Sequence, residues 1–348
     1  MTTQSKRLNA ITCFAREEQK FLITNYSLNI NIHEIPIEIF NKKKKFLLVI
    51  LFFNLIKIFK QKNIEFVLIF GEKEFHNVFL ILVSKLLKVK VICFQWAISF
   101  ENKGYKYLHS KIKNRTSINS QSYLGQLREL FLRTIFMLFL IKYKKCIYFG
   151  DGMSDYLITF GPHWKNKFKK ENVLSENKFI NGYFPKKYIV KNFIKQKVLL
   201  ILGAGNEIYS DSIKLQDWLN YLEDLNVIKD ELTVRLHPKS CIGIKNVLKD
   251  KGIDVSCNTL SVDLSSAKLV FLDRSTILLD CIQNDIPFVF YKYKPNLFIN
   301  LNDMILENRL IDQINSFICK NKYHYVGDKS IAHNNLSNII KNNIPMNI

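Results

Sequence analysis

Short apolar segments alternate with longer segments of helical periodicity along most of this chain. Residues 64–71 are mainly apolar and end in a glycine, residues 75–87 carry apolar side chains at helical spacing, and residues 89–94 are mainly apolar again. Apolar runs of this length are typical of strands buried on both faces of a sheet, and helices between them connect such strands in parallel. The pattern therefore predicts an α/β fold built from parallel βαβ units.

The alternation is interrupted near the middle of the chain and then starts again. In the first half we expect strands at 20–24, 64–71, 89–94, 145–149 and 178–185, with helices at 42–60, 75–87, 124–142 and 164–170. In the second half we expect strands at 197–202, 232–236, 268–272 and 287–291, with helices at 212–225, 242–251, 277–283 and 304–320.

The length of 348 residues exceeds that of one typical domain. We therefore predict an N-terminal domain at 1–188 and a C-terminal domain at 189–330, followed by a polar tail at 331–348. The linker is expected within 186–196, and two such domains in tandem predict a cleft between them.

The chain carries a formal net charge of +21, from 51 Lys+Arg against 30 Asp+Glu. Such an excess attracts polyanions, which include nucleic acids, anionic lipids and phosphorylated substrates. The basic residues are spread along the sequence and no pattern of a nucleic-acid-binding module is present. We expect no nucleic-acid partner, and the alternatives are a non-catalytic protein that binds nucleic acid or membrane, or lysine enrichment without a function.

Two apolar stretches, 46–59 and 130–141, are shorter than the roughly 20 residues that a membrane span needs. We expect buried helices there, and a helix lying on an anionic inner membrane is the alternative. The seven cysteines form no CxxC pair, which indicates a reducing cytosol, and residues 1–10 lack the apolar core of a signal peptide. The expected location is cytoplasmic, with peripheral contact to the inner membrane as the alternative.

The segment 232–239 joins a predicted strand to a His-Pro step. Pro238 cannot extend a sheet interior, so His237 is expected at the carboxyl end of the strand, where open α/β sheets bind their ligands. Histidine titrates near neutral pH and can hydrogen-bond or protonate a leaving phosphate. Arg235 points into the sheet or toward the ligand depending on register, and Lys239 adds a cation. A structural histidine and a solvated lysine are the alternatives.

Ser275 and Thr276 follow the predicted strand at 268–272 and precede the helix at 277–283. Hydroxyl groups at a helix start either cap the helix or bind a phosphate, because both roles use the same geometry. We expect this strand end to neighbour the end that carries His237. Together the two ends would then form one phosphate site.

Glycines follow the predicted strand at 197–202. Gly203 and Gly205 form a fragment of a phosphate-binding loop, but the third glycine of the dinucleotide fingerprint is missing. We expect this turn to contact the base or ribose of a nucleotide. No Asp-x-Asp pair that would hold a metal on a nucleotide-sugar diphosphate is present, so the prediction is a metal-independent reaction without a cofactor.

The remaining candidates lie in the first half. Asp151 stands between two glycines and could act as a base that takes the proton of an acceptor hydroxyl, or belong to a simple turn. Gln95 and Trp96 end the predicted strand at 89–94 and could line an acceptor pocket. A buried tryptophan is the alternative for Trp96.

The segments at 234–239, 265–280 and 286–289 resemble the C-terminal half of bacterial GT-B glycosyltransferases. The resemblance is greatest to enzymes that use CMP-activated acidic sugars, namely sialyl- and polysialyltransferases and the capsule Kdo transferases. It extends more distantly to the glycerophosphotransferases of teichoic acid synthesis. It implies a GT-B-like fold of two Rossmann-like βαβ domains that face a central cleft.

In the sialyltransferase families an HP motif and a downstream Ser/Thr pair hold the CMP phosphate. The resemblance gives that role to His237 and Pro238 and to Ser275 and Thr276. A third motif of two acidic residues and a glycine supplies the base in those families. Residues 150–152 resemble it at Asp151 but have glycine at the first acidic position.

The resemblance implies an inverting glycosyltransferase that passes a sialic acid-like sugar or Kdo from a CMP-activated donor to a lipooligosaccharide or capsule precursor. Its partners would be the nucleotide-sugar donor and a glycan or glycolipid acceptor. The alternatives are a CDP-glycerol glycerophosphotransferase or another nucleotide-sugar transferase of surface polysaccharide synthesis.

Overall fold

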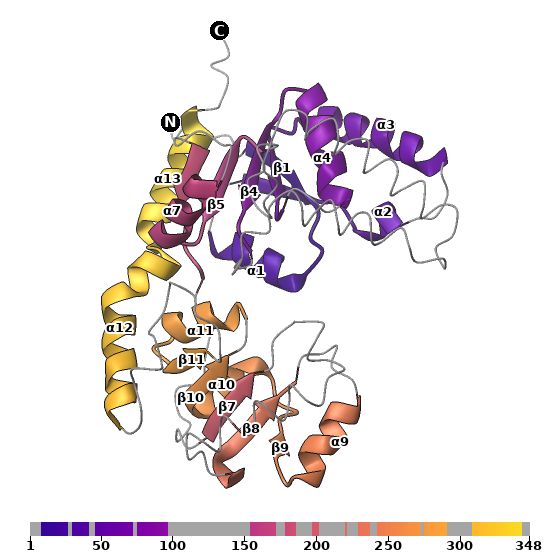
Figure 1. The fold of residues 1–348 in the computed structure, drawn as a ribbon. Helices are drawn as coiled ribbons and strands as arrows, with labels where there is room; N and C mark the ends of the chain where they lie inside the picture. Colours follow the sequence, from indigo (N-terminus) through magenta and orange to yellow (C-terminus); the bar gives the residue numbers. More distant parts are fainter. Residues whose placement is uncertain are drawn as a thin grey trace, which may run out of the picture. The chain divides into compact units, whose positions relative to one another are not determined.

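The structure is a computed structural model that describes residues 8–26, 30–41, 46–71, 75–96, 154–171, 178–185, 197–201, 220, 229–236, 242–272, 275–290 and 308–342. Its contacts divide the chain into two compact units (Figure 1). The N-terminal unit comprises Met1–Pro185 together with Gly327–Ile348, and the C-terminal unit comprises Lys186–Val326.

The N-terminal unit contains a parallel sheet with the strand order β2-β1-β3-β4-β5-β6. The strands are β1 (Leu8–Thr12), β2 (Ile30–Glu34), β3 (Phe66–Ile69), β4 (Lys90–Phe94), β5 (Tyr156–Thr159) and β6 (Phe179–Asn181). All residues of β3 are buried, and in β4 only Lys90 is exposed. This burial is expected of parallel strands that are covered on both faces.

Helices cover this sheet. The described helices of the unit are α1 (Glu17–Asn25), α2 (Glu38–Asn41), α3 (Phe46–Gln61), α4 (Phe75–Leu86), α7 (Pro162–Glu171) and α13 (Lys329–Asn342). α4 packs on β3 and β4, α3 packs on α4, and α7 packs on β5 and β6. In the part of the chain that the structure describes, no helix is long and apolar enough to cross a membrane.

The strand expected at 20–24 is wrong. These residues lie in α1, and the strand of this region is β1, which precedes it. Gln19, Leu22 and Ile23 are buried on one helix face, at the spacing of an amphipathic helix. Glu17 and Glu18 occupy the first turn, where carboxylates favour the positive end of the helix dipole.

The C-terminal unit contains a second parallel sheet, with the strand order β11-β10-β7-β8-β9. Its strands are β7 (Lys197–Ile201), β8 (Leu232–Arg235), β9 (Asp254–Val255), β10 (Ala267–Leu272) and β11 (Phe288–Phe290). Its described helices are the 3₁₀ turn Lys229–Glu231, α9 (Ile242–Asp250), α10 (Leu260–Ser266), α11 (Ile277–Gln283) and α12 (Asn308–Val326). The predicted α/β fold with parallel sheets is confirmed.

The end of the chain differs from the polar tail expected at 331–348. Residues 329–342 form α13, which packs against β6 of the N-terminal unit. The Asn335 side chain donates to the carbonyl of Asn181 at 3.2 Å, and a ring nitrogen of His333 lies 3.2 Å from the carbonyl of Tyr26. Ala332, Leu336 and Ile339 are buried, so the helix has an apolar face that the polar composition of the segment concealed.

Candidate functional site

Three neighbouring strands of the C-terminal unit end at the same level. Leu272 of β10 is in register with Ile201 of β7, and Ile201 is in register with Arg235 of β8. Because adjacent strands are about 4.8 Å apart, the three carboxyl ends lie within about 10 Å of one another. This edge is where open parallel sheets bind ligands.

The expectation that the ends of β8 and β10 are direct neighbours is wrong, because β7 pairs with both strands and separates them. The last four residues of β7 are apolar and buried, as a strand in the middle of a sheet requires. The three carboxyl ends nevertheless share one sheet edge.

The sequence continues from these ends into the predicted donor-binding residues. Gly203 and Gly205 follow β7, and His237, Pro238 and Lys239 follow β8. These five residues lie outside the described part of the chain, so their roles stay predictions.

Ser275 and Thr276 lead into α11 after β10. The hydroxyl of Ser275 accepts a hydrogen bond from the backbone N–H of Ile277 at 3.3 Å, so this side chain caps the helix start. Thr276 has helical dihedral angles (φ −63, ψ −15) and makes no capping hydrogen bond within the described part of the helix. Both side chains are half-buried. Capping therefore accounts for Ser275 and leaves the hydroxyl of Thr276 for another role.

Arg235 ends β8 and is held at the sheet edge by α10 and the loop before it. Its Nη1 donates to Oδ2 of Asp263 at 2.6 Å and to the carbonyl of Asn258 at 2.8 Å. The side chain of Asp263 is 3% exposed, whereas that of Arg235 is 26% exposed. Both contacts use one nitrogen of a guanidinium that carries five N–H donors, so the exposed part can still donate to a ligand.

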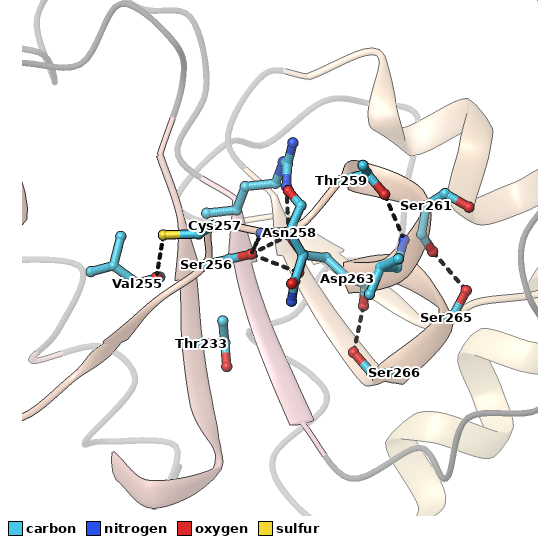
Figure 2. A network of polar contacts seen from close by, with 12 residues as sticks. Thr233, Val255, Ser256, Cys257, Asn258, Thr259, Ser261, Asp263, Ser265 and Ser266 are labelled. Atoms are coloured by element: carbon cyan, nitrogen blue, oxygen red, sulfur yellow. Dashed lines mark hydrogen bonds and ion pairs between the residues drawn. The ribbon is translucent and has the colours of Figure 1, made fainter.

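Asp263 is the centre of a polar network between β9 and α10 (Figure 2). The hydroxyl of Ser256 donates to its carboxylate at 2.7 Å, and the amide of Asn258 donates to it at 3.3 Å. Thr259 caps α10 by accepting from the N–H of Val262 at 3.5 Å. The network anchors the loop that holds Arg235. The sequence did not single out Ser256, Asn258, Thr259 or Asp263 as site residues, although a threonine before an apolar segment is a recognisable helix start.

The acceptor-side candidates end β4 of the N-terminal unit. Gln95 is 1% exposed, its N–H donates to the carbonyl of Ile158, and its side-chain oxygen accepts from the N–H of Phe160 at 3.0 Å. These contacts tie β4 to β5 and occupy the carbonyl of the Gln95 side chain. They give Gln95 a structural role, and its predicted place in an acceptor pocket remains a prediction.

Trp96 is half-buried at the same sheet edge. The guanidinium of Arg16 lies 4.6 Å from the centroid of its ring, a cation–π arrangement. The indole N–H is buried and has no hydrogen-bond partner among the residues that are described. The guanidinium covers one face of the ring, so stacking on a sugar would use the opposite face, and the cation can attract an anionic group. Arg16 was missed because its proximity to Trp96 depends on the sheet order.

Asp151 lies outside the described residues, but the start of β5 that follows it is described. The N–H of Val91 donates to the carboxylate of Asp155, and the N–H of Asp155 donates to the carbonyl of Val91, each at 2.8 Å. Val91 stands near the start of β4, so Asp155 lies at the amino edge of the sheet, opposite the edge of Gln95 and Trp96. The role of Asp151 as the base stays a prediction.

Among the described residues, no group of three or more His, Cys, Asp or Glu side chains could hold a metal ion.

No protein-family model matches the sequence, and no curated protein matches it. Several solved structures are similar along nearly the whole chain. UDP-GlcNAc 2-epimerase from Methanocaldococcus jannaschii is 12% identical with a TM-score of 0.54, covering 97% of this chain and 100% of its own. MnaA from S. aureus, solved with UDP, is 11% identical with a TM-score of 0.57, covering 97% and 98%. The spinosyn forosaminyltransferase SpnP is 11% identical with a TM-score of 0.51, covering 97% and 100%. The fold is therefore of the GT-B type.

Proposed function

We propose that this protein is an inverting glycosyltransferase that transfers an acidic sugar from a CMP-activated donor to a cell-surface glycan. The observation that carries the proposal is the common level of the three strand ends at Ile201, Arg235 and Leu272. The chain continues from these ends into the glycine pair, the His-Pro step and the Ser/Thr pair, the segments that carry the resemblance to CMP-sugar transferases.

The proposed reaction is a single displacement at the anomeric carbon. The acceptor oxygen forms a bond to this carbon while the bond to the phosphate oxygen breaks and leaves its electron pair on CMP. Charge therefore develops on the phosphate, where fixed donors stabilise it in the transition state. Thr276 supplies a hydroxyl not used for capping, Arg235 supplies a guanidinium, and His237 hydrogen-bonds or protonates the leaving phosphate.

The acceptor is proposed to bind at the carboxyl edge of the N-terminal sheet, where Trp96 and Arg16 are in contact. The ring can stack on a sugar face. A base must remove the proton of the acceptor hydroxyl, and Asp151 is the candidate from the sequence. Asp151→Asn would lose transfer while retaining CMP binding if this assignment is right, and would transfer normally if it is wrong.

The test is a transfer assay with a panel of CMP-, CDP- and UDP-activated donors, in the presence and absence of EDTA. We expect hydrolysis or transfer with a CMP-activated acidic sugar, unchanged by EDTA, and a loss of at least about a hundredfold in His237→Ala, the size typical of a catalytic acid or base. A His237→Ala variant as active as the parent would contradict the mechanism. Turnover of CDP-glycerol would instead identify a glycerophosphotransferase.

A second candidate is a nucleotide-sugar 2-epimerase, because one of the similar structures described above carries that name. Epimerisation needs no acceptor. Incubation with UDP-N-acetylglucosamine alone, followed by NMR of the sugar, separates the two functions. Formation of the C2 epimer would replace the transferase proposal.

A further inference from the structure

α3 is apolar on two opposite sides. Leu51, Leu55 and Phe59 recur at a spacing of four residues and are buried against the unit. Ile50 and Phe53 lie on the outer side, with 41% and 63% of their surface exposed. Adjoining exposed apolar side chains of this size make the outer side a candidate contact surface.

The same outer face is cationic toward its carboxyl end. Lys57 and Lys60 are exposed and follow Ile50 and Phe53 at helical spacing, so the four side chains share one face. We call these four residues the α3 face. The helix contains no acidic residue, and the sequence enters it through four consecutive lysines at 42–45.

We propose that the α3 face seats the N-terminal unit on an anionic lipid bilayer. Ile50 and Phe53 would enter the boundary between headgroups and acyl chains, and Lys57 and Lys60 would lie against the lipid phosphates. Lysine suits this role because its long stem lies along apolar surface while its ammonium group stays in water.

The composition of the face distinguishes a bilayer from other partners. Protein–protein interfaces are depleted in lysine, whereas headgroup-level helices combine lysine with aromatic and aliphatic side chains. A single-stranded nucleic-acid site stacks successive bases on several aromatic rings along its cations, whereas the α3 face carries one phenylalanine beside an isoleucine. The net charge of +21 also attracts the protein to an anionic membrane surface.

The position of α3 fits such contact. In Figure 1 the helix lies on the outer side of the N-terminal unit, with α13 on the opposite side of that unit. α13 therefore offers a matched control surface, since Lys329 and Ile331 are exposed there and the isoleucine is 54% exposed.

The experiment is flotation of the full chain with phosphatidylcholine vesicles, with and without phosphatidylglycerol, and without any donor. We expect the protein to float with the anionic vesicles only and to be released by about 0.5 M NaCl, because salt screens the lysine contacts. Ile50→Ser/Phe53→Ser and Lys57→Gln/Lys60→Gln should each lower the partition coefficient at least about tenfold. Lys329→Gln/Ile331→Ser should float like the parent.

Failure of the parent to float with anionic vesicles overturns the proposal, and so does unchanged flotation of both α3 variants. If the α13 variant loses as much vesicle binding as the α3 variants, the net charge of the protein causes the binding and the α3 face does not. A second copy of the chain is the other partner that could cover the α3 face, and analytical ultracentrifugation tests it. A dimer that dissociates in Ile50→Ser/Phe53→Ser would show that a second copy covers the face. Lipid binding is measured without a sugar donor, so its outcome is independent of the proposed transferase activity.

Discussion

At the scale of single residues, the ion pair of Asp263 and Arg235 connects stability to the proposed site. The carboxylate is nearly removed from solvent and accepts from the guanidinium, from Ser256 and from Asn258. A buried charge with several donors is stable only while its partners remain. The pair therefore fixes the position of the one described cation at the three strand ends.

We expect Asp263→Asn to lower the free energy of unfolding by about 2–3 kcal/mol, because it leaves the Arg235 charge and several donors without their carboxylate. Urea denaturation measures this change. The control is Lys197→Gln, which breaks an ion pair with Asp254 whose side chains are 50% and 57% exposed. That loss should stay below about 0.5 kcal/mol, and equal losses in the two variants would refute the buried-pair account.

The sequence identified Arg235 and Ser275 as candidates because each stands at the end of an apolar strand. The sequence does not show whether the Arg235 side chain points into the sheet or toward the ligand. The choice depends on Asp263, which the β9–α10 connection brings to the end of β8. A pair that forms only after the sheet has assembled leaves no local pattern in the sequence.

At the scale of elements, the chain packs closely against the N-terminal unit where it re-enters that unit at Gly327. We call this contact the tight seam. Gly327 pairs with Tyr183 just before α13, and the Tyr26 hydroxyl accepts from the N–H of Tyr183 at 2.9 Å. A Cβ on Gly327 would lie 2.1 Å from the carbonyl oxygen of Gly182 and 2.2 Å from that of Phe160. Backbone atoms cannot move aside for it, so this position requires glycine.

Gly327→Ala separates this crowding from the conformational preference of glycine. The control is Gly252, which has nearly the same φ (+73 against +74) but would place its Cβ in open space. We expect Gly252→Ala to cost about 1–2 kcal/mol from its left-handed backbone, and Gly327→Ala to cost at least about 2 kcal/mol more through the added clashes. Thermal unfolding measures both, and similar losses would contradict the tight seam.

The same seam predicts a loss of stability in alkali. Burial raises the pKa of Tyr183 from 10.0 to about 12, and burial also raises the pKa of Tyr26. The unfolded chain releases these protons near pH 10, whereas the native protein retains them, so their contribution is complete below pH 10 and is lost as the pH rises toward 12. Melting temperatures between pH 9 and 12 should fall more steeply for the parent than for Tyr26→Phe. Parallel curves would contradict the prediction.

Elements with strong periodicity could be predicted, and those defined by their packing could not. The strands around Leu68 and Val234 and the helix at 277–283 follow from local pattern. α1 was mistaken for a strand because a short apolar run at 21–23 has no period of its own. The two-residue strand β9 is defined only by its pairing with β8, and α13 has too few apolar residues to indicate burial.

At the scale of the whole molecule, two parallel sheets give the protein two carboxyl edges with different chemistry. The edge of the C-terminal unit carries hydroxyls and a paired guanidinium, which suit a phosphate. The edge of the N-terminal unit carries an aromatic ring with a cation over one face, and a sugar is proposed to stack on the other face. The presence of two sheets follows from the sequence, because each half repeats the βαβ pattern. The resemblance to CMP-sugar transferases concerns the second half, where the proposed donor site lies.

The central claim is that the ends of β10, β7 and β8 bind a cytidine nucleotide, and calorimetric titration of the full chain with CMP and UDP tests it most directly. We expect CMP to bind more tightly than UDP, and Thr276→Val to weaken CMP binding about tenfold through one lost hydrogen bond. Thr24→Val, whose hydroxyl donates to a carbonyl within α1, should bind CMP like the parent. No CMP binding by the parent, or equal affinity in Thr276→Val, would contradict the account.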